Sequence, residues 1–426
     1  MPRRKRADTS LATVLAVLAL TGLPGAPQGE EGCDPTISLP DGFCARIFAD
    51  SIGRARHIVV AENGDVFVAL RRSRGGAAVG VVALRDSDGD AKADIRHHFG
   101  DFGGTGIALY DGYLYFGAND RVMRYPLPAG SLDPSGALQT IVSGLPDDRS
   151  HRDKSIAVTA AGGLYVNIGA PSNACQEESR TPGSPGIDPC PDLERRAGIW
   201  RFDADRQGQN QDDGERFATG LRNVVALTLH PQTGDVYGAQ HGRDQLGSIW
   251  PDLFTVEDNA EKPSEELVKI ERGDDFGWPY CYHDPVLNRL VLAPEYGGDG
   301  NAAGRCSSKK EPLVAFPAHW GPNALLFYTG DQFPERYRGG AFIAFHGSWN
   351  RAPLPQGGYN VVFVPFAGDE PAGDWEVFAD GFAGEEVSPR GATHRPSGLA
   401  QGPDGSLYVT DDRGGRIWKI VYTGDD

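Results

Sequence analysis

The sequence lacks the patterns from which long helices are predicted. It contains only two methionines, and long amphipathic helical patterns are hard to find along its 426 residues. Turn-forming residues are abundant instead, with 57 glycines and 31 prolines. This composition favours many short strands joined by tight turns, so the chain is predicted to be all-β. The length permits a large core, because closed all-β folds can run long as one unit.

Positive charge is also scarce. The chain has 41 lysines and arginines against 58 aspartates and glutamates, which gives a formal net charge of -17. A protein that binds nucleic acid needs a basic face for the phosphates, so this balance argues against such a partner. The overall charge does not exclude a local basic pocket.

No apolar run is long enough for a membrane anchor. The N-terminus has a basic leader, an apolar stretch from Leu11 to Leu20 and then small residues. A membrane-spanning helix needs roughly 20 apolar residues, whereas this pattern is typical of a secretory signal peptide. We therefore expect a signal peptide over about residues 1–26, cleavage near Ala26, no membrane span after its removal, and a periplasmic or secreted protein.

The cysteines lack the spacing of a zinc site, since neither CxxC nor HxxxH occurs. Six cysteines fit an exported protein that forms disulfides. Sequence alone cannot fix their connectivity, but bonds between neighbours in separate loops are the simplest choice. The expected pairs are Cys33 with Cys44, Cys175 with Cys190, and Cys281 with Cys306.

A two-part strand pattern recurs six times along the chain. Each copy begins with a turn that ends in glycine and continues into an aromatic and β-branched strand, as in ENGDVFVAL and DGSLYVTDD. A second strand-like segment follows each copy, such as VVALRD or RIWKIVY. The turn glycines are Gly64, Gly112, Gly163, Gly234, Gly340 and Gly405. Insertions at 172–197 and 273–320 break the period, so the repeat is one of architecture.

Small antiparallel sheets that repeat in this way bury both faces when they pack radially, which predicts a six-bladed β-propeller over residues 33–424. The early segment FCARIFAD, 43–50, precedes the first full blade and can pair with the last blade to close the ring. A two-sheet sandwich is the alternative, and the number of copies disfavours it.

Polar residues stand at equivalent places before the first strand of several blades. Residues 220–242, GLRNVVALTLHPQTGDVYGAQHG, read as a hairpin whose two ends meet, which brings Arg222 and Asn223 near His241 and Gly242. The equivalent places in the first, third and sixth blades hold Arg56, His151 and Arg395, and the exit of a fifth-blade hairpin adds His346, Trp349 and Arg351.

If these strands line the channel, the residues converge on one mouth of it. Guanidinium groups pair with carboxylates and stack on flat rings, so such a ring suits a planar polyanion. Each arginine taken alone is more commonly a solvated rim charge or the partner of an aspartate. The coincidence of equivalent positions is what favours a binding site.

Several ordered motifs resemble the soluble pyrroloquinoline quinone (PQQ)-dependent sugar dehydrogenases, especially the L-sorbosone dehydrogenase branch. The resemblance covers about Leu39 to Tyr422. It is carried by GLRN with the following hairpin and HG, HRDKSIAV to LYVNIG with SNAC, DFGWPYCY, AFHGSWNR, and RPSGLAQGPDGSLYVTDD.

This resemblance implies a six-bladed propeller with PQQ across the top of the channel and His151 as the general base, a role that suits imidazole. Arg222 and Asn223 would hold the quinone oxygens. The carbonyls of Gly242 and Arg243 would ligate a Ca²⁺ ion that polarises the quinone. The full set expected to bind the cofactor is Arg56, Arg222, Asn223, His241, Arg351 and Arg395.

The chain also departs from the family pattern. Arg351 stands where better-known glucose-oxidising members have a lysine, and His241 takes a glutamine position. A haem attachment sequence CxxCH is absent, so electrons are expected to leave to a separate acceptor. The implied substrate is a sugar or a sugar-derived alcohol or aldehyde. A calcium-dependent lactonase-like hydrolase and a non-enzymatic propeller that binds a glycan or protein remain alternatives.

The segment DSDGDAKAD, 86–94, places Asp86, Asp88, Asp90 and Asp94 around one loop, as oxygen-loving cations require. It departs from an EF-hand at Ala91, where glycine is expected, and it lacks the final glutamate. A structural Ca²⁺ site and a merely acidic turn are both consistent with it.

Overall fold

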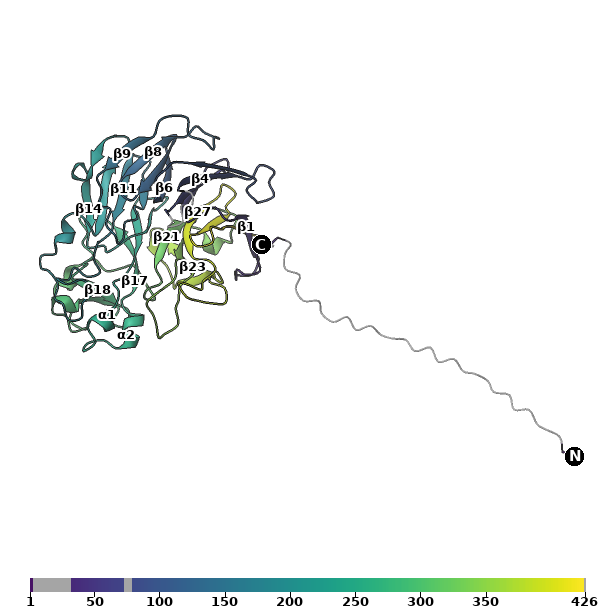
Figure 1. Ribbon diagram of the computed structural model, residues 1–426. Helices are drawn as coiled ribbons and strands as arrows, with labels where there is room; N and C mark the ends of the chain where they lie inside the picture. The colour runs from purple at the N-terminus through teal and green to yellow at the C-terminus, as the bar shows by residue number, and fades with distance from the viewer. Residues whose placement is uncertain (3–31, 73–78, 425–426) are drawn as a thin grey trace.

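Six small antiparallel sheets surround a common centre in the computed structural model (Figure 1). The structure describes residues 1–2, 32–72 and 79–424. The predicted signal peptide lies outside the described residues, apart from the first two. The prediction of a six-bladed β-propeller is confirmed.

Each of the first three blades pairs its strands mainly in chain order. The first contains β2 (Ala55–Val60), β3 (Val66–Leu70), β4 (Gly80–Arg85) and β5 (Ile95–Phe99). The second contains β6 (Gly104–Tyr110), β7 (Tyr113–Ala118), β8 (Val122–Pro126) and β9 (Gln139–Ser143), with β13 (Gln209–Asn210) at its edge. The third contains β10 (Ile156–Val158), β11 (Gly163–Ile168), β12 (Gly198–Asp203) and β14 (Glu215–Thr219).

The remaining blades follow the same plan. The fourth contains β15 (Ala226–Leu229), β16 (Val236–Gln240), β17 (Glu265–Ile270) and β20 (Val314–Phe316). The fifth contains β21 (Pro322–Phe327), β22 (Ala341–Phe345), β23 (Asn360–Val364) and β26 (Glu376–Ala379). The sixth contains β27 (Pro396–Gln401), β28 (Leu407–Asp411), β29 (Ile417–Tyr422) and, from the other end of the chain, β1 (Phe43–Ala49).

Strand β1 closes the ring, as the sequence predicted. It pairs antiparallel with β29, and Phe43 lies opposite Tyr422. The indole of Trp418 on β29 donates a hydrogen bond of 3.0 Å to the carboxylate of Asp34. This pairing covers the outer edge of the last blade, which would otherwise be left without a neighbouring strand.

The core lies between the blades. Six large clusters of buried apolar side chains each join two neighbouring blades, including the last blade and the first. Every residue of β3 and β22 is buried because each sheet packs against a neighbour on both faces. The repeated aromatic and β-branched strands therefore form the second strands of the six blades.

The first strands of the blades line the central channel. All six contribute residues, most of them of apolar type, to a cavity of about 400 Å³ along it. Because these strands run in the same direction through the channel, the residues at their starts share one rim. His57 on β2 shows this, since its Nε2 lies 2.8 Å from the carbonyl oxygen of Asn323 on β21.

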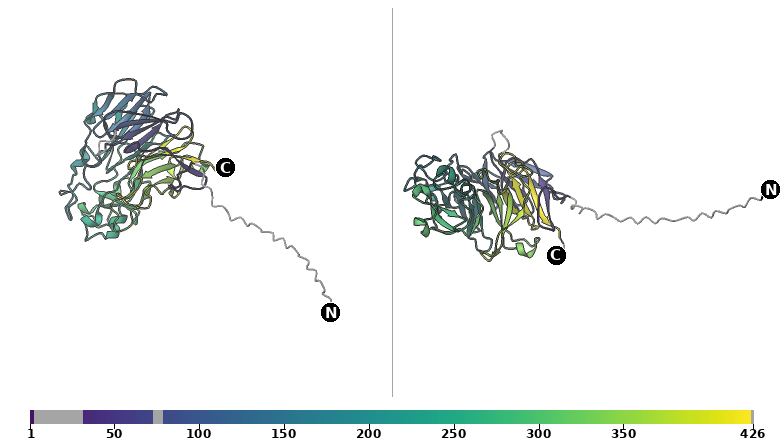
Figure 2. Two further views of the ribbon diagram at one scale, coloured as in Figure 1. Left: turned by 45° about the vertical axis from the view of Figure 1, so that its right-hand side comes forward. Right: turned by 90° about the horizontal axis from the view of Figure 1, so that it is seen from below.

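Insertions extend the fourth blade. They contain α1 (Leu246–Ile249), α2 (Val256–Glu261), β18 (Cys281–Asp284) and β19 (Arg289–Leu292), and a small β24 (Phe366–Ala367) and β25 (Glu370–Pro371) hairpin belongs to the fifth. The teal and green insertions gather at one side of the ring (Figure 2).

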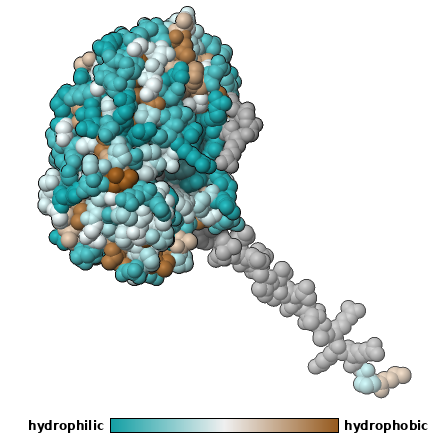
Figure 3. Space-filling model, turned by 60° about the vertical axis from the view of Figure 1, so that its left-hand side comes forward, coloured by the Kyte–Doolittle hydropathy of each residue, from teal (hydrophilic) through white to brown (hydrophobic). Residues whose placement is uncertain are grey.

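The face in Figure 3 is largely hydrophilic, with small separate hydrophobic patches. No helix in the described part of the chain has the length and apolarity needed to cross a membrane.

All three predicted disulfides are present: Cys33–Cys44, Cys175–Cys190 and Cys281–Cys306.

Candidate active site

The predicted polar residues gather at the rim where the first strands begin. The hairpin at 220–242 forms as β15 and β16, and the backbone NH of His241 donates to the carbonyl oxygen of Asn223 at 2.9 Å. Its two ends therefore meet, as the sequence predicted. The exits of the second strands add His346 after β22 and Asp412 after β28 to the same rim.

Arg56 is held by two aspartates. Its side chain is only 2% exposed, and its Nη2 and Nη1 atoms lie 3.2 and 3.3 Å from carboxylate oxygens of Asp153 and Asp412. Asp412 also lies 2.8 Å from His346 Nε2. Burial alone would raise the pKa of Asp412, but the charges of His346 and Arg56 lower it well below the usual range. Arg56 thus lies in the site between two carboxylates, one of which also contacts His346.

Arg222 is also buried, and its guanidinium makes four hydrogen bonds. Its guanidinium donates to the Asn173 side-chain and backbone oxygens, to the Gly242 carbonyl at 2.8 Å, and to Asp244 Oδ2 at 3.1 Å. Burial lowers the pKa of Arg222, and Asp244 opposes this effect. Burial acts to raise the pKa of Asp244, but Arg222 and Arg180 outweigh it and bring the pKa to about 2. Arg222 is therefore held in one orientation beside an ionised carboxylate.

His151 has one ring nitrogen fixed and one available. Its backbone is left-handed, with φ 49, and its Nδ1 lies 2.6 Å from the carbonyl oxygen of Ala170. A carbonyl only accepts hydrogen bonds, so Nδ1 carries the proton and Nε2 keeps its lone pair. Among the described residues, none forms a hydrogen bond with Nε2. Burial, helped by the positive charge of Arg222, lowers the pKa of His151 to about 3, so the imidazole is neutral near pH 7 and can take a proton.

A glycine lets His151 approach the neighbouring blade. A Cβ atom at Gly169 would lie 2.6 Å from the Cβ of His151 and 2.7 Å from Oδ1 of Asn223, closer than real contacts allow. Any larger residue at this position would push the two side chains apart.

Asn223 lies between its neighbours on the rim. Its Oδ1 accepts from Asn167 at 3.2 Å, and its Nδ2 lies 3.5 Å from Nδ1 of His241. His241 Nε2 donates to the Pro322 carbonyl oxygen at 2.8 Å. Burial lowers the pKa of His241 to about 4, so this imidazole is also neutral near pH 7.

Arg395 approaches from the sixth blade. Its Nε and Nη2 donate to the carbonyl oxygens of His346 and Gly347 at 2.8 and 2.7 Å, and its guanidinium carbon lies 5.3 Å from the ring centroid of Tyr359. These contacts leave Nη1 without a partner among the described residues. Arg395 thus differs from Arg56 and Arg222, in which every guanidinium nitrogen has a partner.

The structure brings together His151, Arg222, Asn223 and His241, and links them through the same rim to Arg56, His346 and Arg395. Arg351 stands apart: its Nη1 donates to the carbonyl oxygens of Ala260 and Ala318. Its neighbour Asn350 contacts the site instead, through a 3.0 Å hydrogen bond to Asp244.

The two residues expected to offer backbone carbonyls to an ion lie beside Arg222. The Gly242 carbonyl accepts one hydrogen bond from Arg222, and a carbonyl oxygen has a second lone pair for a ligand. The side chain of Arg243 turns into the protein and pairs with Glu295, both residues being buried.

The acidic loop at 86–94 lies elsewhere. It joins β4 to β5, the outer strands of the first blade. The carboxylates of Asp86, Asp88 and Asp90 lie within 4.8 Å of one another, whereas Asp94 accepts from the backbone and hydroxyl of Ser87. Asp86 also accepts from backbone NH groups of its own loop, so the loop is a well-formed turn.

Sequence reasoning missed the carboxylates of the site. Asp153, Asp244 and Asp412 each neutralise one of the predicted arginines. A signal was present for two of them, because Asp153 and Asp244 end the short motifs HRD and HGRD, which also supplied predicted residues. Spacing alone did not show that these acids turn toward the arginines.

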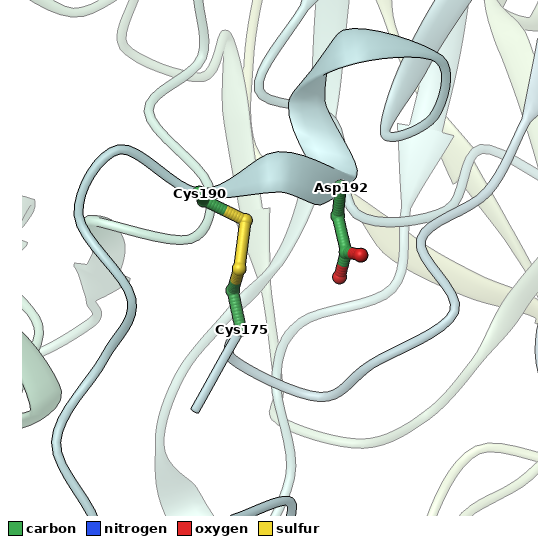
Figure 4. Close-up of side chains that lie close together, drawn as sticks. All are labelled: Cys175, Cys190 and Asp192. Atoms are coloured by element: carbon green, nitrogen blue, oxygen red, sulfur yellow. A yellow bond between two sulfur atoms is a disulfide. The ribbon is translucent and has the colours of Figure 1, made fainter. Parts of the chain in front are cut away.

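Asn173 is held by a disulfide-bonded loop. The Cys175–Cys190 bond joins the two ends of this loop near Asp192 (Figure 4). These three residues are close enough to hold a metal ion, but both sulfur atoms are used in the disulfide, and Asp192 accepts from Ser172 at 2.6 Å. The group is therefore a structural brace for Asn173, which contacts Arg222.

This arrangement suits the abstraction of a proton beside a bound anion. Comparison with known proteins shows the family to which the chain belongs. A family profile described as TrAA12-like matches residues 37–423. The chain belongs to the TrAA12-like family. This agrees with the resemblance to PQQ-dependent sugar dehydrogenases seen in the sequence.

Two curated relatives of this TrAA12-like chain differ in how much they share with it. An uncharacterized protein of Borreliella burgdorferi is 26% identical over 400 residues, 91% of each chain. A pyrroloquinoline quinone-dependent pyranose dehydrogenase of Coprinopsis cinerea is 26% identical over 270 residues. That match covers 53% of this chain and only 34% of the relative, so about two thirds of the relative lies outside it.

Solved structures share the fold of the TrAA12-like chain. The holo form of the pyranose dehydrogenase PQQ domain from Coprinopsis cinerea has a TM-score of 0.74 at 19% identity, covering 93% of this chain and 99% of that one. A calcium structure of a Trichoderma reesei protein of Carbohydrate-Active Enzymes Family AA12 has a TM-score of 0.73 at 19% identity, covering 91% and 97%.

Proposed function

We propose that this protein is an exported quinoprotein oxidoreductase that oxidises a sugar or a sugar-derived alcohol or aldehyde, with His151 as the general base. The observation that carries the proposal is the neutral His151 imidazole, whose Nε2 is available beside Arg222 and Asn223 at the channel mouth. PQQ-dependent sugar dehydrogenase activity among its relatives supports the same reaction class.

The residues at the rim fit an anionic quinone. Arg395 has a spare donor, Asn223 and His241 lie at the same edge, and Asn350 Oδ1 is a buried acceptor with no partner among the described residues. Such donors can hold carboxylate and carbonyl oxygens. Arg56 and Arg222 already have carboxylate partners, so their role is to keep the rim's donors in place and to lower the energy of added negative charge.

The proposed chemistry needs one proton and one hydride to leave the substrate. PQQ, when bound, would supply the acceptor for the hydride from the substrate carbon, and its two electrons would then pass to a separate acceptor. His151 Nε2 takes the hydroxyl proton, and Nδ1 stays bonded to Ala170 so that the ring keeps its orientation. A Ca²⁺ ion at the carbonyls of Gly242 and Arg243 would polarise the quinone.

A calcium-dependent hydrolase receives less support. Within the described residues, the groups of acids, histidines and cysteines close enough to hold an ion are the Cys175 group and the loop at Asp86. Neither is at the channel mouth, where Asp153, Asp244 and Asp412 are each tied to an arginine.

Export is supported by the three disulfides, since these bonds persist in oxidising compartments such as the periplasm or the extracellular space.

Reconstitution tests the proposal. Purified protein is mixed with PQQ and Ca²⁺, and quinone absorbance and dye reduction are followed with a panel of aldoses, polyols and sugar aldehydes. Reduction of the dye by at least one of these compounds, with dependence on added PQQ, is expected. A cofactor that binds but stays oxidised with the whole panel would overturn the proposed activity.

A further inference from the structure

A large basic cleft adjoins the candidate active site. Its volume is about 870 Å³, and it lies at the rim of the first two blades. Six arginines line it together with two aspartates and an aromatic ring: Arg54, Arg71, Arg72, Arg121, Arg149 and Arg152, with Asp120, Asp147 and Phe102. The positive excess is notable because the whole chain carries a net charge of -17.

Several of these arginines form no ion pair within the described part of the chain. Arg72 and Arg149 have no side-chain hydrogen bond or ion pair with any described residue, and Arg71 has none either, although its charge helps to lower the pKa of Asp153. By contrast, Arg121 is paired with Asp120 at 2.7 Å, and Arg152 lies 3.6 Å from Asp147. Like charges gathered in one cleft repel one another, so the fold gains nothing from this grouping.

Two residues that line the cleft are next to residues of the site. Arg152 follows His151 directly in the chain. Arg54 Nη2 lies 4.0 Å from the Asp412 carboxylate that also holds Arg56. A ligand anchored in the cleft would therefore extend toward the imidazole.

The chemistry of the lining defines the ligand. Unpaired guanidinium groups bind carboxylates with paired hydrogen bonds, and clefts of a few hundred Å³ and more hold ligands larger than one monosaccharide. Phe102, with Arg121 over its ring at 5.0 Å, offers a flat apolar surface beside these donors. A sugar has both the polar edge and the weakly apolar face that such a lining matches.

We propose that this cleft binds the carboxylate of an acidic sugar, so that the substrate class is a uronic acid or an oligosaccharide that contains one. This inference depends on the proposed sugar oxidation, and it deepens it by naming the substrate class. The cleft holds the carboxylate while a neutral hydroxyl or aldehyde carbon of the same molecule reaches His151.

Binding measurements test this inference separately from turnover. Calorimetry with the PQQ- and Ca²⁺-treated protein compares a trimer of galacturonic acid, a neutral galactose trimer and inorganic phosphate. The acidic trimer is expected to bind at least about tenfold more tightly than the neutral trimer, and added salt should weaken it. The double variant Arg71→Gln/Arg149→Gln should lose about tenfold of that affinity.

Arg289→Gln is the matched control. Arg289 is exposed on β19 and donates to the Asn301 carbonyl oxygen, away from the cleft. Arg289→Gln removes one positive charge, as Arg149→Gln alone does, and should leave binding unchanged. Thermal unfolding verifies that both variants fold, and Arg149→Gln alone serves if the double variant does not.

The outcomes separate the two proposals. Equal binding of the acidic and neutral trimers overturns the acidic-sugar inference even if neutral sugars are oxidised. Unchanged affinity of the arginine variants for the acidic trimer overturns it as well. Phosphate that binds as tightly as the acidic trimer, with the same arginine dependence, also overturns it in favour of a general anion site. Arginine-dependent binding of the acidic trimer without oxidation of any sugar supports the cleft and rejects the oxidoreductase proposal.

Discussion

The Nη2 atom of Arg222 lies 3.1 Å from Oδ2 of Asp244, and both residues are buried at the channel mouth. Asp244 also pairs with Arg180 at 2.8 Å and accepts from Asn350. One carboxylate therefore organises three donors from separate segments. Asp244 is also the carboxylate that pairs with Arg222, whose other acceptors are oxygens of Asn173 and Gly242.

Removal of the negative charge of Asp244 should destabilise the protein and weaken the binding of PQQ. Asp244→Asn leaves the buried Arg222 without its anion, a loss of about 3–5 kcal/mol in the free energy of unfolding. PQQ binding, followed by absorbance titration, should weaken as well. Glu271→Gln is the control, since Glu271 forms an exposed pair with Lys310 and should change stability by about 1 kcal/mol at most. Equal effects of the two variants would contradict this role for Asp244.

Loss of the base should stop turnover and spare cofactor binding. His151→Asn keeps a residue that tolerates the left-handed backbone at this position. Dye reduction with an active sugar should fall by about 10²–10⁴-fold, the usual contribution of a general base. His97→Asn changes an exposed histidine beside Asp133 and should leave the rate unchanged. A His151→Asn protein with full turnover would remove the imidazole from the mechanism.

Opening the Cys175–Cys190 bond should affect both stability and the site. The bond closes a separation of 15 residues, for which the expected loss is about 3 kcal/mol in the free energy of unfolding. The Cys175→Ser/Cys190→Ser variant should also bind PQQ more weakly, because the bond anchors Cys175, two residues after Asn173, which accepts a hydrogen bond from Arg222. The Cys33–Cys44 bond, with a separation of 11, is the control. Its removal should cost stability and leave PQQ affinity intact, and weakened affinity in both variants would point to general loosening.

Glu265 should make stability fall as pH rises. Its carboxyl accepts from the backbone NH groups of Gly242 and Gly321, and burial raises its pKa to about 8 from the usual 4.5. Between these two values the unfolded chain binds fewer protons at Glu265 than the folded chain. This residue's contribution is complete below pH 4.5 and is lost by pH 8, at up to about 1.4 kcal/mol per pH unit.

His151 has the opposite effect in acid, since its folded pKa of about 3 lies below the value of 6.5 for the unfolded chain. Its contribution is complete above pH 6.5, so the effect of Glu265 is cleanest between pH 6.5 and 8. Chemical denaturation of wild type and Glu265→Gln across this window measures the difference. Parallel pH curves would show that Glu265 does not change its protonation on unfolding in this range.

The sequence by itself determined the architecture. Glycine turns followed by aromatic and β-branched strands repeat six times, and a strand pattern of this kind buries both faces only by radial packing. It favoured the disulfide pairs that the structure shows, because each pair joins neighbouring cysteines across one short loop. The antiparallel hairpin, whose ends must meet, placed Arg222 and Asn223 beside His241, and the equivalent position in the third blade placed His151 at the same channel mouth.

Only the tertiary structure decided how the charges are balanced. It paired Arg56 with Asp153 and Asp412 and Arg222 with Asp244, and it turned Arg351 toward loop carbonyls. It also gathered the unpaired arginines of two neighbouring blades into one cleft. Sequence spacing fixes where a side chain starts, but the direction of a long guanidinium depends on which acceptors the neighbouring blades place within reach.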